Sequence, residues 1–179
     1  MKTTQILFAG FGGQGILFSG KFLAYKGLME DLQVSWLPSY GPEMRGGTAN
    51  CSVVLSDESI VSPIVLEPTE LIAMNLPSLL KFESLVKPGG TIFVNSSVVD
   101  KKVERTDVKA VYVDCIKIAD ELGNSKVANM VMLGAYIEAM KNLSTETIKE
   151  MLVHMFTGPK AKLVDLNIEA LKRGAACVE

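Results

Sequence analysis

The chain has 179 residues, enough for a sizeable core, and we expect residues 1–179 to form one domain. Lys and Arg number 18 against 20 Asp and Glu, so the net charge is −2 without basic clusters, which makes nucleic acid and membrane surfaces poor candidates as partners. Hydrophobic residues make up 48% of the chain and the mean hydropathy is +0.27, which is typical of a subunit that buries part of its surface against other chains.

The three cysteines are odd in number and far apart, which is typical of a protein from the reducing cytoplasm. The apolar run that starts at Ile6 leaves no room for a signal peptide, and no apolar run reaches the length of a transmembrane helix. We therefore expect a cytoplasmic protein. Three scattered cysteines and one histidine, His154, also make no recognisable zinc or iron–sulfur site.

The first motif is a glycine-rich loop that follows a short apolar run at residues 6–9. It reads Gly-Phe-Gly-Gly-Gln-Gly over 10–15, and apolar residues at helical spacing follow it, so the pattern predicts a strand, a loop and a helix over 15–29. The backbone N–H groups of such a loop can hold an anion at the helix N-terminus, where a Cβ would keep the ligand away. We therefore predict a cofactor-binding role for five residues: Gly10, Gly12, Gly13, Gln14 and Gly15. The same glycines would also suit a tight turn that binds nothing.

A second strand is predicted at 33–37, ending before Pro38. A nicotinamide or flavin site needs an acid at the tip of the second strand to bind the ribose hydroxyls. Here Glu30 and Asp31 precede the strand, and its tip carries Pro38 and Ser39. We therefore expect neither an NAD nor an FAD site.

The second motif is another glycine-rich loop, Ser-Tyr-Gly-Pro-Glu-Met-Arg-Gly-Gly-Thr, over 39–48. Loops of α/β proteins commonly carry function, and an arginine fork suits a carboxylate or a phosphate. The predicted cofactor-binding residues of this loop are Tyr40, Glu43, Arg45, Gly46 and Gly47. The alternative is a surface ion pair between Arg45 and Glu43.

The remaining pattern predicts strands at 49–55, 71–74, 91–94 and 111–114, and helices at 77–86, 116–122, 130–140, 144–156 and 163–173. A short strand at 60–61 would form a hairpin with 49–55, and Ser144 would cap the helix that follows it. The helix at 130–140 is apolar on nearly all sides, which predicts burial on more than one face. Asn95, Ser96 and Ser97 follow a strand and are candidate lining residues, because open α/β sheets bind ligands at the carboxyl ends of their strands. The fold class is therefore α/β: a Rossmann-like, mostly parallel sheet flanked by helices, with a helical C-terminal part and an appended β-hairpin.

No catalytic motif is present. The chain has neither a GxxxxGK[ST] loop nor a GxSxG elbow, and His154 has no recognisable triad partner. We therefore predict no catalytic residue. Two glycine loops without a catalyst indicate a domain that holds part of a cofactor while another chain performs the chemistry.

Together, the two loops resemble those of the gamma subunit of 2-oxoacid:ferredoxin oxidoreductases, a family that includes the pyruvate, 2-oxoglutarate and ketoisovalerate enzymes. The segments Asn-Met-Val-Met-Leu-Gly at 129–134 and Asn-Ile-Glu-Ala-Leu at 167–171 are also similar to that family. The resemblance implies an accessory subunit of an enzyme that decarboxylates a 2-oxoacid on thiamine diphosphate, passes electrons through iron–sulfur clusters to ferredoxin and releases an acyl-CoA.

The same resemblance implies alpha, beta and delta-type subunits as partners, with thiamine diphosphate and the iron–sulfur clusters on those chains and no cofactor bound by this chain alone. It also implies that this domain packs beside the catalytic subunits and helps to close the coenzyme A channel. A second hypothesis, of another class, is a stand-alone nucleotide- or acyl-CoA-binding sensor module.

Overall fold

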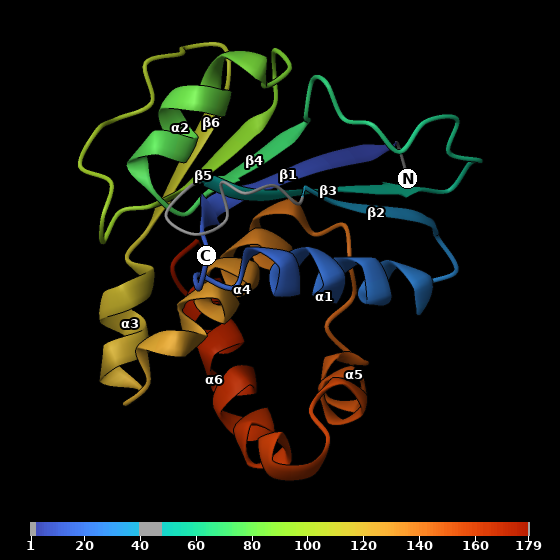
Figure 1. Cartoon of the computed structure of the whole chain (residues 1–179), viewed down its shortest axis with the longest axis vertical. Helices are drawn as coiled ribbons and strands as arrows, with labels where there is room; N and C mark the ends of the chain where they lie inside the picture. Colours follow the sequence, from blue (N-terminus) through green and yellow to red (C-terminus); the bar gives the residue numbers. More distant parts are fainter. Residues whose placement is uncertain (1–2, 40–47, 179) are drawn as a thin grey trace.

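The computed structural model describes residues 3–39 and 48–178, and in this part of the chain a six-stranded sheet lies between helices (Figure 1). The strands are β1 (Thr4–Phe11), β2 (Gln33–Ser39), β3 (Thr48–Ser56), β4 (Glu70–Ala73), β5 (Thr91–Asn95) and β6 (Lys109–Val113), in the spatial order β2-β3-β1-β4-β5-β6. Strand β3 runs antiparallel to β2 and β1, while β1, β4, β5 and β6 are parallel. The predicted α/β fold is confirmed.

The helices are α1 (Ile16–Leu28), α2 (Leu76–Phe82), α3 (Cys115–Glu121), α4 (Ala128–Met140), α5 (Ile148–Met155) and α6 (Val164–Ala175). Short 3-10 turns lie at Glu83–Leu85, Ser125–Val127 and Gly158–Leu163. Figure 1 shows α2 on one side of the sheet and α1, α4 and the other C-terminal helices on the opposite side. The predicted helical C-terminal part is therefore present.

The central strand β1 is buried on both faces. Ile6 and Phe8 pack into the larger core, which the sheet shares with α1, α4 and α6, whereas Leu7 and Ala9 pack into the smaller core under α2. All four side chains are at most 5% exposed. This burial explains why the strand is a continuous apolar run, as is usual for parallel strands covered on both sides.

Helix α4 is buried throughout residues 128–137, which confirms the prediction that it is covered on more than one face. It packs against α6 where Gly134 and Gly174 let the two backbones touch. A Cβ on Gly134 would lie 1.9 Å from the Leu171 carbonyl oxygen, and one on Gly174 would lie 1.8 Å from the Val131 carbonyl oxygen. Glycine is therefore required at both positions by packing.

Three predicted details differ from the structure. Strand β2 continues through Pro38 to Ser39, because β2 is an edge strand and an edge position does not need the N–H that proline lacks. The hairpin of 49–55 with 60–61 is wrong: β3 pairs with β1 and β2, and Val61 is fully exposed outside any strand. The antiparallel hairpin of this sheet is β2 with β3.

The third difference is the start of α5, which begins at Ile148 and is not capped by Ser144. Ser144 Oγ accepts from the Glu146 N–H at 3.1 Å in a turn before the helix. The Ser144 N–H donates to Glu30 Oε1 at 2.7 Å, and Glu30 forms an ion pair with Lys26 of α1 at 2.6 Å. This contact with α1 holds the 141–147 segment in a non-helical path. The other predicted elements are present with slightly shifted ends. No helix in the described ranges is long and apolar enough to span a bilayer.

Candidate functional site

The first glycine loop connects β1 to α1 at the carboxyl edge of the parallel strands. Gly13 and Gly15 have φ angles of +94° and +75°, a backbone conformation that favours glycine. A Cβ on Gly13 would meet nothing within 4 Å, so the chain is open to a ligand at this point. Gly15 is the N-cap of α1, and the N–H groups of the first turn lack partners within the helix. This arrangement can hold an anion.

The Gln14 side chain fixes the shape of the loop. Its Oε1 accepts hydrogen bonds from the Phe11 N–H at 2.7 Å and from Asn75 Nδ2 at 3.3 Å, and its Nε2 donates to the Met74 carbonyl oxygen at 3.1 Å. A Cβ on Gly10 would lie 2.7 Å from the same Oε1. Since Nε2 carries two hydrogens, one remains for a ligand. The structure thus gives Gln14 a positioning role, and its direct contact with a cofactor stays a prediction.

Helix α4 supports the loop from the side. Asn129 is buried near the start of α4, and its Nδ2 donates to Ser19 Oγ at 3.3 Å, while Ser19 Oγ donates to the Gly15 carbonyl oxygen at 3.0 Å. A Cβ on Gly15 would lie only 2.6 Å from Asn129 Nδ2. The glycine loop and the start of α4, which are far apart in the sequence, therefore pack in close contact at Gly15.

A hollow of about 250 Å³ lies in front of this loop. Its lining combines polar and apolar residues from the glycine loop, the carboxyl ends of β4 and β5 and the starts of α3 and α4: Gly13, Gln14, Met74, Asn95, Ile116, Ser125, Lys126, Ala128 and Asn129. Gly13, Gln14 and Asn95 were predicted as site residues from the sequence, whereas Lys126 was not. Its signal was the polar run 124–126 directly before the apolar helix α4. Lys126 supplies a cation beside the glycine loop.

A second, more open hollow of about 760 Å³ lies next along the same edge. It is lined by Ser96, Ser97, Asp114, Ile116, Lys117, Asp120 and Glu121. The predicted lining residues Ser96 and Ser97 are thus both at the surface of a hollow. The Ser97 hydroxyl donates to Asp114 and accepts from the Ile116 N–H at 2.9 Å, so it links β5 to the start of α3.

The predicted residues of the second glycine loop, Tyr40, Glu43, Arg45, Gly46 and Gly47, lie outside the described residues. The strand ends on either side of this loop are described. Thr48 pairs with Phe11 and Ser39 pairs with Asn50, so both ends lie at the carboxyl edge of the sheet, beside the first loop. The described flanks of the second loop thus lie beside the first loop, and the shared site stays a prediction.

The remaining reactive side chains lie away from this edge or are engaged in packing. Cys51 and Cys115 are buried, and burial raises the pKa of the Cys51 thiol to about 12, so that it stays protonated. Cys177 is exposed near the end of α6, and His154 is exposed on α5. Among the described residues, no three His, Cys, Asp or Glu side chains gather as metal ligands would.

The family described as pyruvate ferredoxin/flavodoxin oxidoreductase matches residues 5–177. This chain belongs to that family. Among its relatives in the family, the ketoisovalerate oxidoreductase subunit VorA of Methanothermobacter marburgensis is 37% identical over 97% of this chain, and the match covers 36% of VorA. The 2-oxoglutarate synthase subunit KorC of the same organism is 37% identical, and the match covers 83% of each chain. The chain therefore spans about a third of VorA but most of KorC.

Two solved structures of the family share the fold. The gamma subunit of a keto/oxoacid ferredoxin oxidoreductase from Geobacter sulfurreducens is 28% identical with a TM-score of 0.82, and the match covers 98% of both chains. A 2-oxoglutarate:ferredoxin oxidoreductase from Magnetococcus marinus, solved with 2-oxoglutarate, coenzyme A and succinyl-CoA bound, is 28% identical with a TM-score of 0.89. That match covers 99% of this chain and 31% of the Magnetococcus chain.

Proposed function

We propose that this chain is the gamma (accessory) subunit of a 2-oxoacid:ferredoxin oxidoreductase, which oxidatively decarboxylates a 2-oxoacid to an acyl-CoA. The observation that carries the proposal is the end-to-end match to the Geobacter gamma subunit, which covers 98% of both chains. In this proposal the chain contributes no catalytic residue of its own. Thiamine diphosphate and the iron–sulfur clusters are bound by other chains of the complex.

The proposed partners are alpha, beta and delta-type subunits, with ferredoxin as the electron acceptor and the cytoplasm as the location. Two relatives support such an assembly, because the matched segment forms only 36% of VorA and 31% of the Magnetococcus chain. A domain that is joined to other segments in some relatives, and forms most of a chain in others, is expected to work beside those segments. Large apolar side chains at the surface, including Leu28, Val61 and Leu66, also favour burial against partners.

The test is to co-express the chain with the neighbouring genes and to purify the complex. Reduction of ferredoxin is then measured with pyruvate, 2-oxoglutarate and 2-oxoisovalerate, each with and without coenzyme A. We expect activity that requires coenzyme A and disappears when this chain is left out. A stable monomer that binds acyl-CoA saturably and joins no complex would instead support the sensor module and contradict the proposal.

We further propose that the glycine loops contact coenzyme A in the complex. A phosphate would lie at the N-terminus of α1 against Gly12, Gly13 and Gly15, with Gly10 and Gln14 shaping the loop and Lys126 as a nearby cation. Support comes from the open side of Gly13 and from the position of Lys126 in the same hollow. The second loop would add Tyr40, Glu43, Arg45, Gly46 and Gly47 from the adjoining strand ends.

Matched glycine variants test this contact in the assembled enzyme. Gly13 and Gly89 both have positive φ, +94° and +79°, and a Cβ on either would meet no atom within 4 Å, but only Gly13 lies at the hollow. Gly13→Ala should raise the KM for coenzyme A while Gly89→Ala should leave it unchanged. Arg45→Ala should raise the same KM about ten- to a hundredfold, since a hydrogen bond to a charged group is worth about 1.5–3 kcal/mol. The KM for the 2-oxoacid should hardly change.

The competing explanation is that the loops form a subunit interface. Under that explanation the variants would dissociate the complex and leave the KM for coenzyme A unchanged in whatever complex remains. Size-exclusion chromatography and kinetics on the same samples therefore separate the two.

A further inference from the structure

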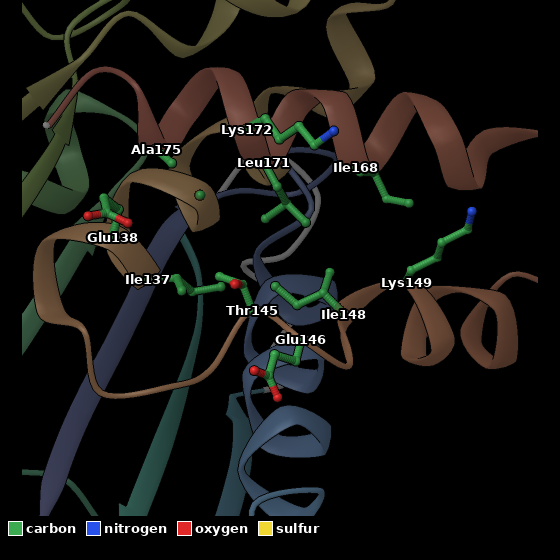
Figure 2. A pocket seen from close by; sticks show the side chains of 11 residues that line it. Ile137, Glu138, Thr145, Glu146, Ile148, Lys149, Ile168, Leu171, Lys172 and Ala175 are labelled. Carbon is green, nitrogen blue, oxygen red and sulfur yellow. The ribbon is translucent and has the colours of Figure 1, made fainter.

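A pocket outside the candidate site lies among α4, α5 and α6. Its volume is about 340 Å³, within the range of small-ligand pockets. The close contact of α4 and α6 at Gly134 and Gly174 fixes one wall, and α5 with the segment before it forms the opposite wall (Figure 2). Because the 141–147 segment is held toward α1 by Glu30, α5 does not fill the space between the two longer helices.

The floor of the pocket is aliphatic. Ile137, Ile148, Ile168, Leu171 and Ala175 line it, and the Thr145 side chain lies between Ile137 and Ile148 (Figure 2). The volume is roughly ten times the 30 Å³ that a water molecule occupies in the liquid, so the pocket holds roughly ten non-hydrogen atoms. An occupant therefore needs a short apolar body.

The charges at the rim are separated by sign. In Figure 2, Lys149 of α5 and Lys172 of α6 extend toward one end of the pocket, Glu138 lies at the other end, and Glu146 lies below Ile148, away from both lysine amines. Within the described residues, Glu138 is paired with Lys141 at 3.2 Å, whereas neither Lys149 nor Lys172 forms an ion pair. The first turn of α5, whose dipole favours negative charge, lies at the lysine end.

We propose that this pocket binds a short aliphatic carboxylate, with its apolar body against the isoleucines and its carboxylate between Lys149 and Lys172. This inference is independent of the proposed function, because the pocket lies on the helical layer away from the glycine loop. The free aliphatic acids and the 2-oxoacids share this chemistry.

The test uses the full chain, in whichever complex keeps it soluble, with isoleucine methyl groups labelled for NMR. The probes are 4-methylpentanoate, 4-methyl-2-oxopentanoate and the neutral 4-methylpentanamide. Saturable shifts are expected for the methyl groups of Ile137, Ile148 and Ile168 but not for Ile72 in the sheet. Both acids should bind more tightly than the amide. Comparing the affinities of the two acids then shows whether the pocket prefers the free aliphatic acid or the 2-oxoacid.

Two variants in the pocket and one control outside it sharpen the result. Lys172→Gln should weaken binding of the acids about three- to fivefold, as for a partly exposed ion pair, and leave the amide unchanged. Lys162→Gln makes the same charge change outside the pocket and should change the affinity for neither the acids nor the amide. Ala175→Leu should weaken acid and amide alike by filling the pocket. Equal affinities for acid and amide, or shifts that do not saturate at the three isoleucines, would overturn the proposal.

Discussion

Gly15 offers the sharpest test of how the glycine loop is held. In Gly15→Ala the new Cβ would have two separate costs, because φ at this position is +75° and because Asn129 Nδ2 lies 2.6 Å from the Cβ position. The variant Gly89→Ala isolates the first of these costs, the backbone strain. Gly89 has φ of +79°, and a Cβ there would meet nothing within 4 Å.

The magnitudes follow from these contacts. A left-handed conformation costs a non-glycine residue about 1–2 kcal/mol, which applies to Gly15→Ala and Gly89→Ala alike. At Gly15 the methyl group also displaces Asn129 and removes its hydrogen bond to Ser19, worth about 1 kcal/mol. We therefore expect losses of unfolding free energy of about 2–3 kcal/mol for Gly15→Ala and about 1–2 kcal/mol for Gly89→Ala.

The assay is urea unfolding followed by the fluorescence of Trp36, the single tryptophan of the chain. Measurements at several protein concentrations exclude an effect of self-association. With urea m-values of about 1–3 kcal/mol/M, the midpoint for Gly15→Ala should fall by about 1 M. A double-mutant cycle with Asn129→Ala should show a coupling of about 1 kcal/mol, since the shorter side chain leaves room for the methyl group.

Equal losses for Gly15→Ala and Gly89→Ala would refute the reasoning. So would a cost of Gly15→Ala that stays the same when Asn129 is alanine. Either result would mean that the loop is not fitted to α4 as the contact distances indicate.

Three further predictions concern assembly, pH and cofactor choice. Expressed alone, the chain should self-associate, and it should become soluble in a heteromer when partners are co-expressed; light scattering of both preparations checks this, and a well-behaved monomer that captures no partner counts against it. Burial raises the pKa of Glu70 from 4.5 to about 7, so the unfolded chain loses this proton first and stability should fall as pH rises between these values. The fall should be at most about 3 kcal/mol and should vanish in Glu70→Gln, as measured by urea unfolding from pH 4.5 to 8. Calorimetry with NADH should show no micromolar binding, because no acid stands at the tip of β2.

The strands could be predicted well because their pattern reflects burial that the structure confirms. The runs at 6–9 and 71–74, and residues 92–94 after Thr91, are apolar without alternation, and the sheet is covered by helices on both faces. The glycine loop could also be predicted, since Gly13 and Gly15 adopt the positive φ that their residue type permits.

The errors arose where a distant contact decides the local structure. Ser144 has the residue type of a helix cap, and its Oγ accepts from the Glu146 N–H, but the helix begins only at Ile148. The Ser144 N–H donates to Glu30 of the segment after α1, more than a hundred residues earlier in the sequence. Lys126 was missed for a similar reason, because only the packing of α4 against α1 brings it beside Gly13. Local patterns carry no information on such contacts.

The place of β3 in the sheet supports the prediction that the glycine loop does not belong to a dinucleotide site. In a dinucleotide-binding fold the strand after the first helix lies directly beside β1, and its tip carries the ribose-binding acid. Here β3 is inserted between β1 and β2, so the tip of β2 lies two strand spacings, about 10 Å, from β1. An acid at that tip would be too far from the loop to bind the ribose of a nucleotide whose phosphates lie at α1.

The same insertion pairs Thr48 with Phe11, which brings the strand ends flanking the second glycine loop next to the first. One change in strand order therefore removes the usual ribose contact and replaces it with the flanks of a second loop, which is why the two loops are best tested as one site.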